Sequence, residues 1–225
     1  MSKKVVIRHG QKCFVYGNYI NGKSGRNRSG GIRVINPNNT VFNNYIDNIE
    51  GGKENSKFPI SIMDGLVDSR LNGYYPADNA IIAYNTVVNS YGPAIKLGVV
   101  NKDVKTLKIA PKNVIVVGNT IINSIGDNDS PYELTDINTT FTIKDNFFTN
   151  GKTTEPGFSL IKLKQIPFSN KFYEVMTKID SMVSAEINNR LSNHNIKLID
   201  SEITIFNQNW ILKKKDVGVS WIKNK

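Results

Sequence analysis

The sequence has one cysteine, two histidines and no long apolar run. Cys13 has no second cysteine in the 225 residues, which excludes an internal disulfide, and a lone thiol is a poor metal ligand. No apolar stretch approaches the roughly 18 residues that cross a membrane. The opening Met1–Gly10 lacks the long apolar segment and the small-residue cleavage site of a signal peptide. We therefore expect a water-soluble protein whose sequence contains no signal peptide.

Acidic residues are also few. The 19 Asp and Glu face 29 Lys and Arg, which gives a formal net charge of +10. This excess favours a polyanionic partner: nucleic acid, an anionic membrane surface or an acidic polysaccharide. The alternative, that the lysines only keep the protein in solution, stays open at this point.

Several catalytic motifs are missing. The chain has no glycine-rich phosphate loop, no His-x-x-x-His pair and no Gly-x-Ser-x-Gly elbow. Asp64, Asp68 and Asp78 do not form a calcium-binding loop. Asp127 and Asp129 stand in Gly-Asp-Asn-Asp-Ser, which is typical of a turn more than of a glycosidase carboxylate pair.

A repeat is present instead. A β-branched residue is followed three positions later by Asn, and four after that by Asn or Gly. The copies are Val15–Gly22, Val41–Asn48, Ile82–Asn89, Val116–Asn123 and Ile143–Asn150, anchored at Asn18, Asn44, Asn85, Asn119 and Asn146. Asn tolerates the left-handed conformation of a sharp bend, and stacked Asn side chains can bond to one another. Unequal spacing between anchors favours a solenoid over a propeller.

A second strand recurs between the anchors, in Gly30–Asn36, Phe58–Gly65 and Pro93–Gly98. The sequence therefore predicts an all-β fold, a right-handed single-stranded parallel β-helix over residues 1–150; a β-sandwich would not explain the repeated Asn. Residues 151–225 are expected to form a C-terminal capping or trailing segment of the same domain. There, Phe158–Leu163 is a candidate strand, and Lys171–Leu191 has apolar residues at helical spacing.

Basic residues inside the apolar strands are the candidate site. Coil stacking would bring Arg8 and Arg33 onto one face of neighbouring coils, with Lys96 further along, in a stripe suited to carboxylates or sulfates. The alternative, that they are simply solvated, is weaker for Arg8 and Arg33 than for Lys96. His9 beside Arg8 is a further candidate, although a lone His is usually structural.

Several longer motifs are more specific than the repeat. Val6–Gly10, Val15–Gly22, Gly30–Val34 and Asn43–Tyr45 closely resemble polysaccharide lyase family 6, the family of chondroitinase B and many alginate lyases. Ile62–Gly65, Asp68–Tyr74 and Asn85–Thr86 look like its next coils. Glu186–Arg190 is faintly similar to a family strand, and Lys215–Trp221 to the segment that closes the lyase domain.

The resemblance implies β-elimination of a uronate-containing polymer, alginate more than chondroitin or dermatan sulfate. A cation neutralises the carboxylate, a base removes the C5 proton and an acid assists departure of O4. By resemblance Arg8 is the acid and His9 its catalytic neighbour, while Arg33, Lys96, Arg70 and Tyr74 are expected to bind substrate. The family's calcium ligands and base Lys lie on coils that precede the Arg-His-Gly strand, and this sequence begins seven residues before Arg8, so neither is carried over.

Two functions stay open. The chain is either a C-terminal portion of a lyase, active together with N-terminal coils, or a non-catalytic β-helix that binds acidic glycans. A nucleic-acid binder is less favoured because the motifs lack interleaved aromatic residues. The resemblance implies a periplasmic or secreted protein.

Overall fold

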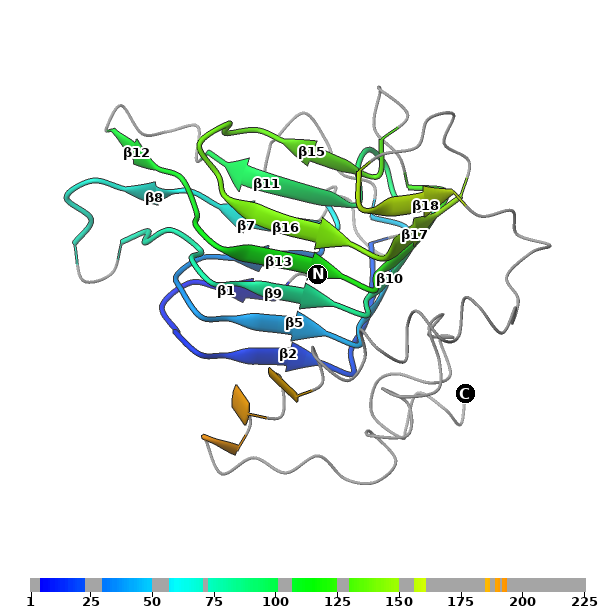
Figure 1. Ribbon diagram of the computed structural model, residues 1–225, viewed down its shortest axis with the longest axis horizontal. Helices are drawn as coiled ribbons and strands as arrows, with labels where there is room; N and C mark the ends of the chain where they lie inside the picture. Colours follow the sequence, from blue (N-terminus) through cyan, green and yellow to red (C-terminus); the bar gives the residue numbers. More distant parts are fainter. Residues whose placement is uncertain are drawn as a thin grey trace.

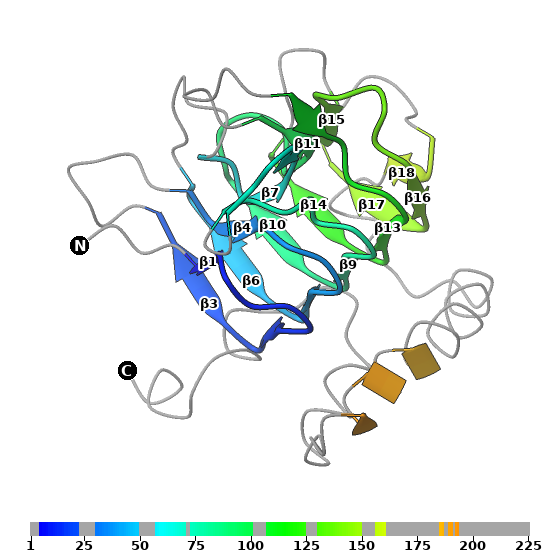
Figure 2. The same ribbon diagram turned by 90° about the vertical axis from the view of Figure 1, so that its left-hand side faces the viewer.

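The computed structural model describes residues 5–22, 30–49, 57–70, 73–100, 107–124, 130–149 and 156–160, together with six residues between 185 and 193. In these parts the chain winds through successive coils of short strands, stacked one above the next (Figure 1). Each complete coil contributes one strand to each of three parallel sheets, and Figure 2 shows these sheets as separate walls around one core. The expected parallel β-helix is confirmed.

The three sheets follow the order of the coils. The first contains β1 (Val5–Ile7), β4 (Ile32–Val34), β7 (Ile60–Met63), β11 (Ile95–Val99) and β15 (Tyr132–Leu134). The second contains β2 (Phe14–Tyr16), β5 (Thr40–Phe42), β9 (Ile81–Ala83), β13 (Val114–Val117) and β16 (Phe141–Lys144). The third contains β3 (Tyr19–Asn21), β6 (Tyr45–Asp47), β10 (Thr86–Val88), β14 (Thr120–Ile122), β17 (Asn146–Phe148) and β18 (Phe158–Leu160). A short antiparallel pair, β8 (Gly65–Leu66) with β12 (Lys108–Ile109), projects beside them.

The core lies between the three sheets and contains mostly β-branched side chains. Alternate residues of each strand point inward, so Val34, Ile62 and Leu97 stack across neighbouring coils of the first sheet. Val41, Ile82 and Val116 form the matching inward row of the second sheet. All six side chains are buried, and five of them are β-branched, the shape that packs well on a pleated sheet.

An asparagine ladder joins the coils at the corner between the second and third sheets. The Nδ2 groups of Asn18, Asn44, Asn85 and Asn119 each donate to Oδ1 of the next anchor, at 2.9, 2.9, 3.0 and 2.8 Å. The last acceptor is Asn146. The ladder expected from the repeat is therefore confirmed, and each repeat copy spans the end of one strand, the corner and the next strand.

The left-handed residue of this corner is not the ladder Asn, as the sequence suggested, but the residue before it. Gly17, Asn43, Tyr84, Gly118 and Asp145 have φ values of 64°, 55°, 55°, 63° and 55°. The anchor is selected for its amide, which bonds in three directions, whereas the bend is made one residue earlier. Only the second requirement involves backbone strain, and it is met by different residues in different coils.

A second apolar cluster lies on the outer face of the second sheet. Phe42, Ile81, Ala83, Tyr84 and Val117 are buried there. Arg190 Nη1 donates to Thr40 Oγ1 and to the Asn79 carbonyl, both at 3.2 Å, and so lies against this sheet. The described residues around it, Ala185–Glu186 and Asn189–Arg190, are helical.

The helical conformation agrees with the apolar spacing and not with the strand suggested by the family resemblance at Glu186–Arg190. Glu186 and Arg190 form an ion pair of 2.8 Å across one turn, a spacing that only a helix brings together. Most of 161–225 lies outside the described residues, including the expected closing segment Lys215–Trp221, so the capping role remains a prediction. No helix among the described residues is long and apolar enough to cross a membrane.

Candidate functional site

The outer face of the first sheet carries the polar residues singled out by the sequence. Parallel pairing places Val6, Arg33, Ser61, Lys96 and Glu133 in one row across five coils. Arg8 lies two residues beyond Val6, on the same face, and therefore diagonal to Arg33 on the neighbouring coil. The expected common face is confirmed, although Arg33 has Val6 as its direct partner in the sheet.

Arg8 and Arg33 meet at the ring of Tyr74. The guanidinium carbon of Arg8 lies 5.4 Å from the ring centre and that of Arg33 lies 5.8 Å from it. Both distances are within the range in which a cation is attracted to an aromatic face. The aromatic ring thus gives both cations a common neighbour, which reduces the cost of placing two like charges close together.

The aromatic ring rests on an apolar platform. Ile35, Met63 and Val99 are buried on this face, and Tyr74 packs against them. Met63 also accepts a contact of 3.3 Å from Arg33 Nε at its sulfur. Arg33 is therefore held from two sides, whereas the Arg8 side chain is exposed.

Asn36 fixes the backbone around the pair. Its Nδ2 donates to the Arg8 carbonyl at 2.7 Å, and its Oδ1 accepts from the Tyr75 N–H at 3.2 Å. Asn36 has a φ of 73°, which turns the chain sharply after β4. One side chain thus links the strand end that carries Arg8 to the segment that carries Tyr74.

Electrostatics distinguishes the two arginines. Burial lowers the pKa of Arg33 from its usual value, the nearby Tyr74 raises it and the charge of Arg8 lowers it. Arginine nevertheless keeps its charge at any physiological pH. Arg8 and Arg33 are two adjacent cations, and the ion pairs found among the described residues involve Lys96 and Arg190 instead, so this arrangement suits carboxylate or sulfate groups of a ligand.

Lys96 does not belong to this pair. Its Nζ lies 2.8 Å from Glu133 Oε2 and 3.9 Å from the centre of the Phe58 ring. The Lys96 side chain is only 8% exposed. Lys96 is therefore neither a solvated surface charge nor a free cation in this conformation, and its role in substrate binding stays a prediction.

His9 and Arg70 are both exposed. His9 follows Arg8 directly and shares its position at the end of β1. Arg70 lies in the turn after β8, and its carbonyl accepts from the Gly73 N–H at 2.6 Å, one residue before Tyr74. The backbone of Arg70 thus shapes the segment that delivers Tyr74.

Sequence reasoning missed Asn36 and Glu133. Asn36 ends the recurrent strand Gly30–Asn36, and an Asn at a strand end was a signal for a turn. Glu133 had no local signal, because its pairing with Lys96 depends on the register of two coils.

The calcium ion that the family resemblance implies does not fit these residues. Calcium takes oxygen ligands, mainly carboxylates and carbonyls. The side chains that converge here are two guanidinium groups and a phenol ring, and no group of three or more His, Cys, Asp or Glu that could hold a metal occurs in the described residues. No step of the chemistry is therefore assigned to calcium on this chain.

Comparisons with solved structures agree with the fold. The structure of AlyGC, described as a PL6 family alginate lyase, superposes with a TM-score of 0.62 at 24% identity, covering 97% of this chain and 26% of that one. A mannuronic acid specific family 6 lyase from human gut microbiota gives 0.51 at 21%, covering 84% and 40%. The chain thus spans about a quarter to two fifths of these proteins. No curated protein matches it.

A family model settles the relationship. The model described as chondroitinase B matches residues 2–208, nearly the whole sequence. The matched range includes every strand of the three sheets and the Arg8, Arg33 and Tyr74 cluster. The chain belongs to the chondroitinase B family, polysaccharide lyase family 6.

Proposed function

We propose that this chain forms the substrate-binding part of a polysaccharide lyase that cleaves alginate by β-elimination. The observation that carries the proposal is the convergence of Arg8 and Arg33 on Tyr74, on the outer face of the first sheet. Two cations on neighbouring coils match a polymer that carries a carboxylate on every sugar. Family membership supports a uronate polymer, and the similarity to AlyGC, described as an alginate lyase, favours alginate.

The chemistry assigns Arg8 to the leaving group. In β-elimination a base takes the C5 proton, the electron pair forms the C4–C5 double bond, and the bond from C4 to O4 breaks. The departing O4 gains negative charge and then a proton. Arg8 is exposed and can approach O4, whereas Arg33, half-buried and held by Met63 and Tyr74, is suited to bind a carboxylate.

Besides Arg8 and Arg33, the reaction needs a base and a group that neutralises the reacting carboxylate. We propose that preceding coils of the β-helix contribute them, as the family resemblance implies. The backbone of β1 agrees with this, because β1 pairs only with β4 among the described strands. A parallel strand edge offers a row of donors and acceptors to a further strand.

Absorbance near 232 nm tests the activity, because the unsaturated uronate product absorbs there. The chain is incubated with alginate, polymannuronate and dermatan sulfate in the presence of calcium, alone and joined to the family's preceding coils. Activity that disappears in Arg8→Ala but persists in Lys12→Ala supports the assignment, since both variants lose one exposed positive charge.

Binding separates the lyase from its alternative. Affinity electrophoresis in alginate should show retardation that Arg33→Ala reduces and Lys12→Ala does not. Binding without cleavage by the extended protein would favour a non-catalytic glycan-binding β-helix. Failure of the chain to bind any of the three polymers would overturn the proposal.

A further inference from the structure

Two carboxyl groups meet at a corner of the β-helix, on either side of β11. Asp64 directly follows β7 and is 4% exposed, and Asp136 follows β15 by two residues. β7 and β15 are the two neighbours of β11 in the first sheet. The Asp64 carboxyl nevertheless interacts directly with that of Asp136.

Gly98 makes this meeting possible. It has a φ of 72° and marks a shift in register, where Leu97 pairs with Ile62 but Val99 pairs with Met63. A Cβ at Gly98 would lie 2.6 Å from Thr139 Oγ1 and 2.8 Å from Asp136 Cβ. The missing side chain therefore leaves a space that Asp136 and Thr139 enter from the next coil.

The oxygen atoms at this corner lack donors. Asp64 Oδ1 and Oδ2 and Thr139 Oγ1 are buried, and apart from a proton that the carboxyls of Asp64 and Asp136 can share, no donor among the described residues reaches them. Thr139 is 5% exposed. Asp136 is better satisfied, because its Oδ1 accepts from the backbone N–H of Asn138 at 2.8 Å and from its Nδ2 at 3.1 Å. A buried carboxylate with so few donors is costly unless a positive charge compensates it.

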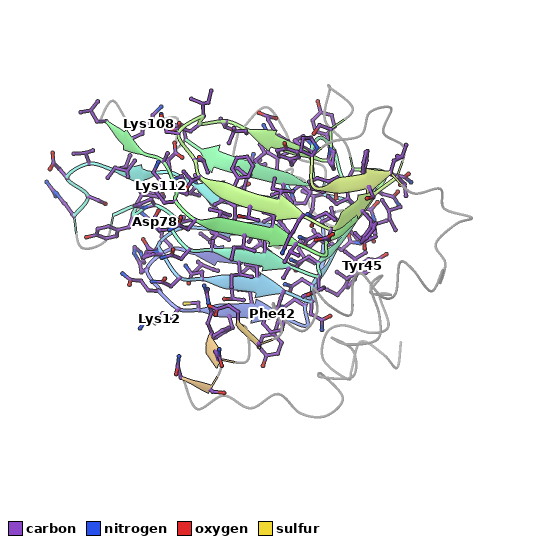
Figure 3. The ribbon with its side chains drawn as sticks, in the orientation of Figure 1. Lys12, Phe42, Tyr45, Asp78, Lys108 and Lys112 are labelled. Carbon is purple, nitrogen blue, oxygen red and sulfur yellow. The ribbon has the colours of Figure 1, made fainter. Side chains whose placement is uncertain are left out.

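The charges around Asp64 also favour a bound cation. Burial, and next the charge of Asp136, raises the pKa of Asp64 to about 7, while Lys108 lowers it. Lys108 is exposed and projects from β12 at the margin of the molecule (Figure 3). When both carboxyl groups are ionised, the single charge of Lys108 leaves them one negative charge in excess.

We propose that Asp64, Asp136 and Thr139 bind a divalent metal ion, of which Ca²⁺ fits best. Two carboxylates and a hydroxyl are oxygen ligands, and Ca²⁺ accepts irregular sets of them more readily than Mg²⁺ does. The ion would connect the strand ends of β7 and β15 across β11. The described neighbours of this site are Gly98 and Lys108, whereas Arg8 and Arg33 gather at Tyr74, so the two groups of residues are treated as separate sites.

The experiment measures Ca²⁺ binding directly. Protein treated with a chelator and then dialysed at pH 8 is equilibrated with ⁴⁵Ca²⁺, and its thermal unfolding is followed with and without Ca²⁺. We expect Ca²⁺ to raise the midpoint by about 5 °C or more when it saturates the site. Asp64→Asn should abolish this shift and the corresponding bound ion. Asp145→Asn, which alters a half-buried carboxyl at the next corner of the β-helix, should keep both.

The stability of metal-free Asp64→Asn protein is a second readout. The amide carries no charge, so this variant should unfold at or above the temperature of the metal-free parent. Thr139→Val retains both carboxylates and should weaken Ca²⁺ binding by about tenfold. The proposal is overturned if Ca²⁺, Mg²⁺ and Mn²⁺ neither bind nor shift the midpoint at pH 8, or if binding survives in both Asp64→Asn and Asp136→Asn. The first result would mean that the two acids share a proton.

Discussion

Asn85 donates from its backbone N–H and its Nδ2 to a single atom, Oδ1 of Asn119, both at 3.0 Å. Its own Oδ1 accepts the equivalent pair from Asn44, at 3.1 and 2.9 Å. Asn85 is fully buried, so every bond lost on substitution leaves a polar group without water. The ladder therefore contributes to stability as a continuous chain and not as separate pairs.

We expect Asn85→Ala to lower the free energy of unfolding by about 3 kcal/mol, because it leaves Asn44 and the Val41 carbonyl unsatisfied. Urea unfolding measures the change. Asn21→Ala is the control, since Asn21 is half-buried and bonds only at the surface of the third sheet. Equal losses in the two variants would contradict the importance of the ladder.

Gly118→Ala tests the contact between neighbouring corners. A Cβ at Gly118 would lie 2.6 Å from Tyr84 Cε1, and the φ of 63° adds strain. We expect a loss of about 2 kcal/mol by thermal or urea unfolding. Tyr84→Asn removes the ring and retains a residue that tolerates positive φ, so part of the loss should be recovered in the double variant. Additive losses would show that the contact does not matter.

Tyr74→Phe and Tyr74→Leu separate the aromatic face from the hydroxyl group. Phe keeps the ring beside Arg8 and Arg33, so alginate binding should stay within about twofold of the parent. Leu removes it, and affinity should fall by roughly three- to tenfold, as expected from one or two cation–π contacts. Tyr75→Leu, at the exposed neighbour, is the matched control. The same loss in Phe and Leu would assign the effect to the hydroxyl instead.

Glu133→Gln tests whether Lys96 is structural. The substitution leaves the buried Lys96 ammonium without its ion-pair partner, and we expect a loss of about 1–2 kcal/mol in urea unfolding. The double variant that combines Glu133→Gln with Lys96→Met should regain most of the lost free energy of unfolding. If Lys96→Met instead keeps stability but removes alginate binding, Lys96 contacts the glycan.

The fold was readable from the sequence because one residue type marks each coil. The anchors Asn18 to Asn146 and the β-branched positions before them specify the stacking, whatever the length of the loops between them. The positions of Arg8 and Arg33 on a common face follow from the same register. What the repeat could not show was the left-handed residue, since Tyr84 and Gly118 meet that need with unrelated side chains.

Long-range contacts explain what the sequence could not predict about the site. Tyr74 reaches Arg8 and Arg33 from a segment that follows the third strand of the first sheet, and nothing in its local sequence specifies that path. Lys96 was expected to be solvated or to bind substrate, but the register of β11 and β15 places Glu133 beside it. Asp64 and Asp136 meet only because β11 shifts register at Gly98.

The asparagine ladder also separates two properties that many folds couple. Successive ladder residues are 26, 41, 34 and 27 positions apart, yet the hydrogen bonds between them keep nearly the same length. The ladder thus aligns neighbouring coils once in every coil, whatever the number of residues between two anchors. Insertions between anchors can therefore change the outer surface while the stacking of the strands stays the same. The binding surface can vary without a change of fold.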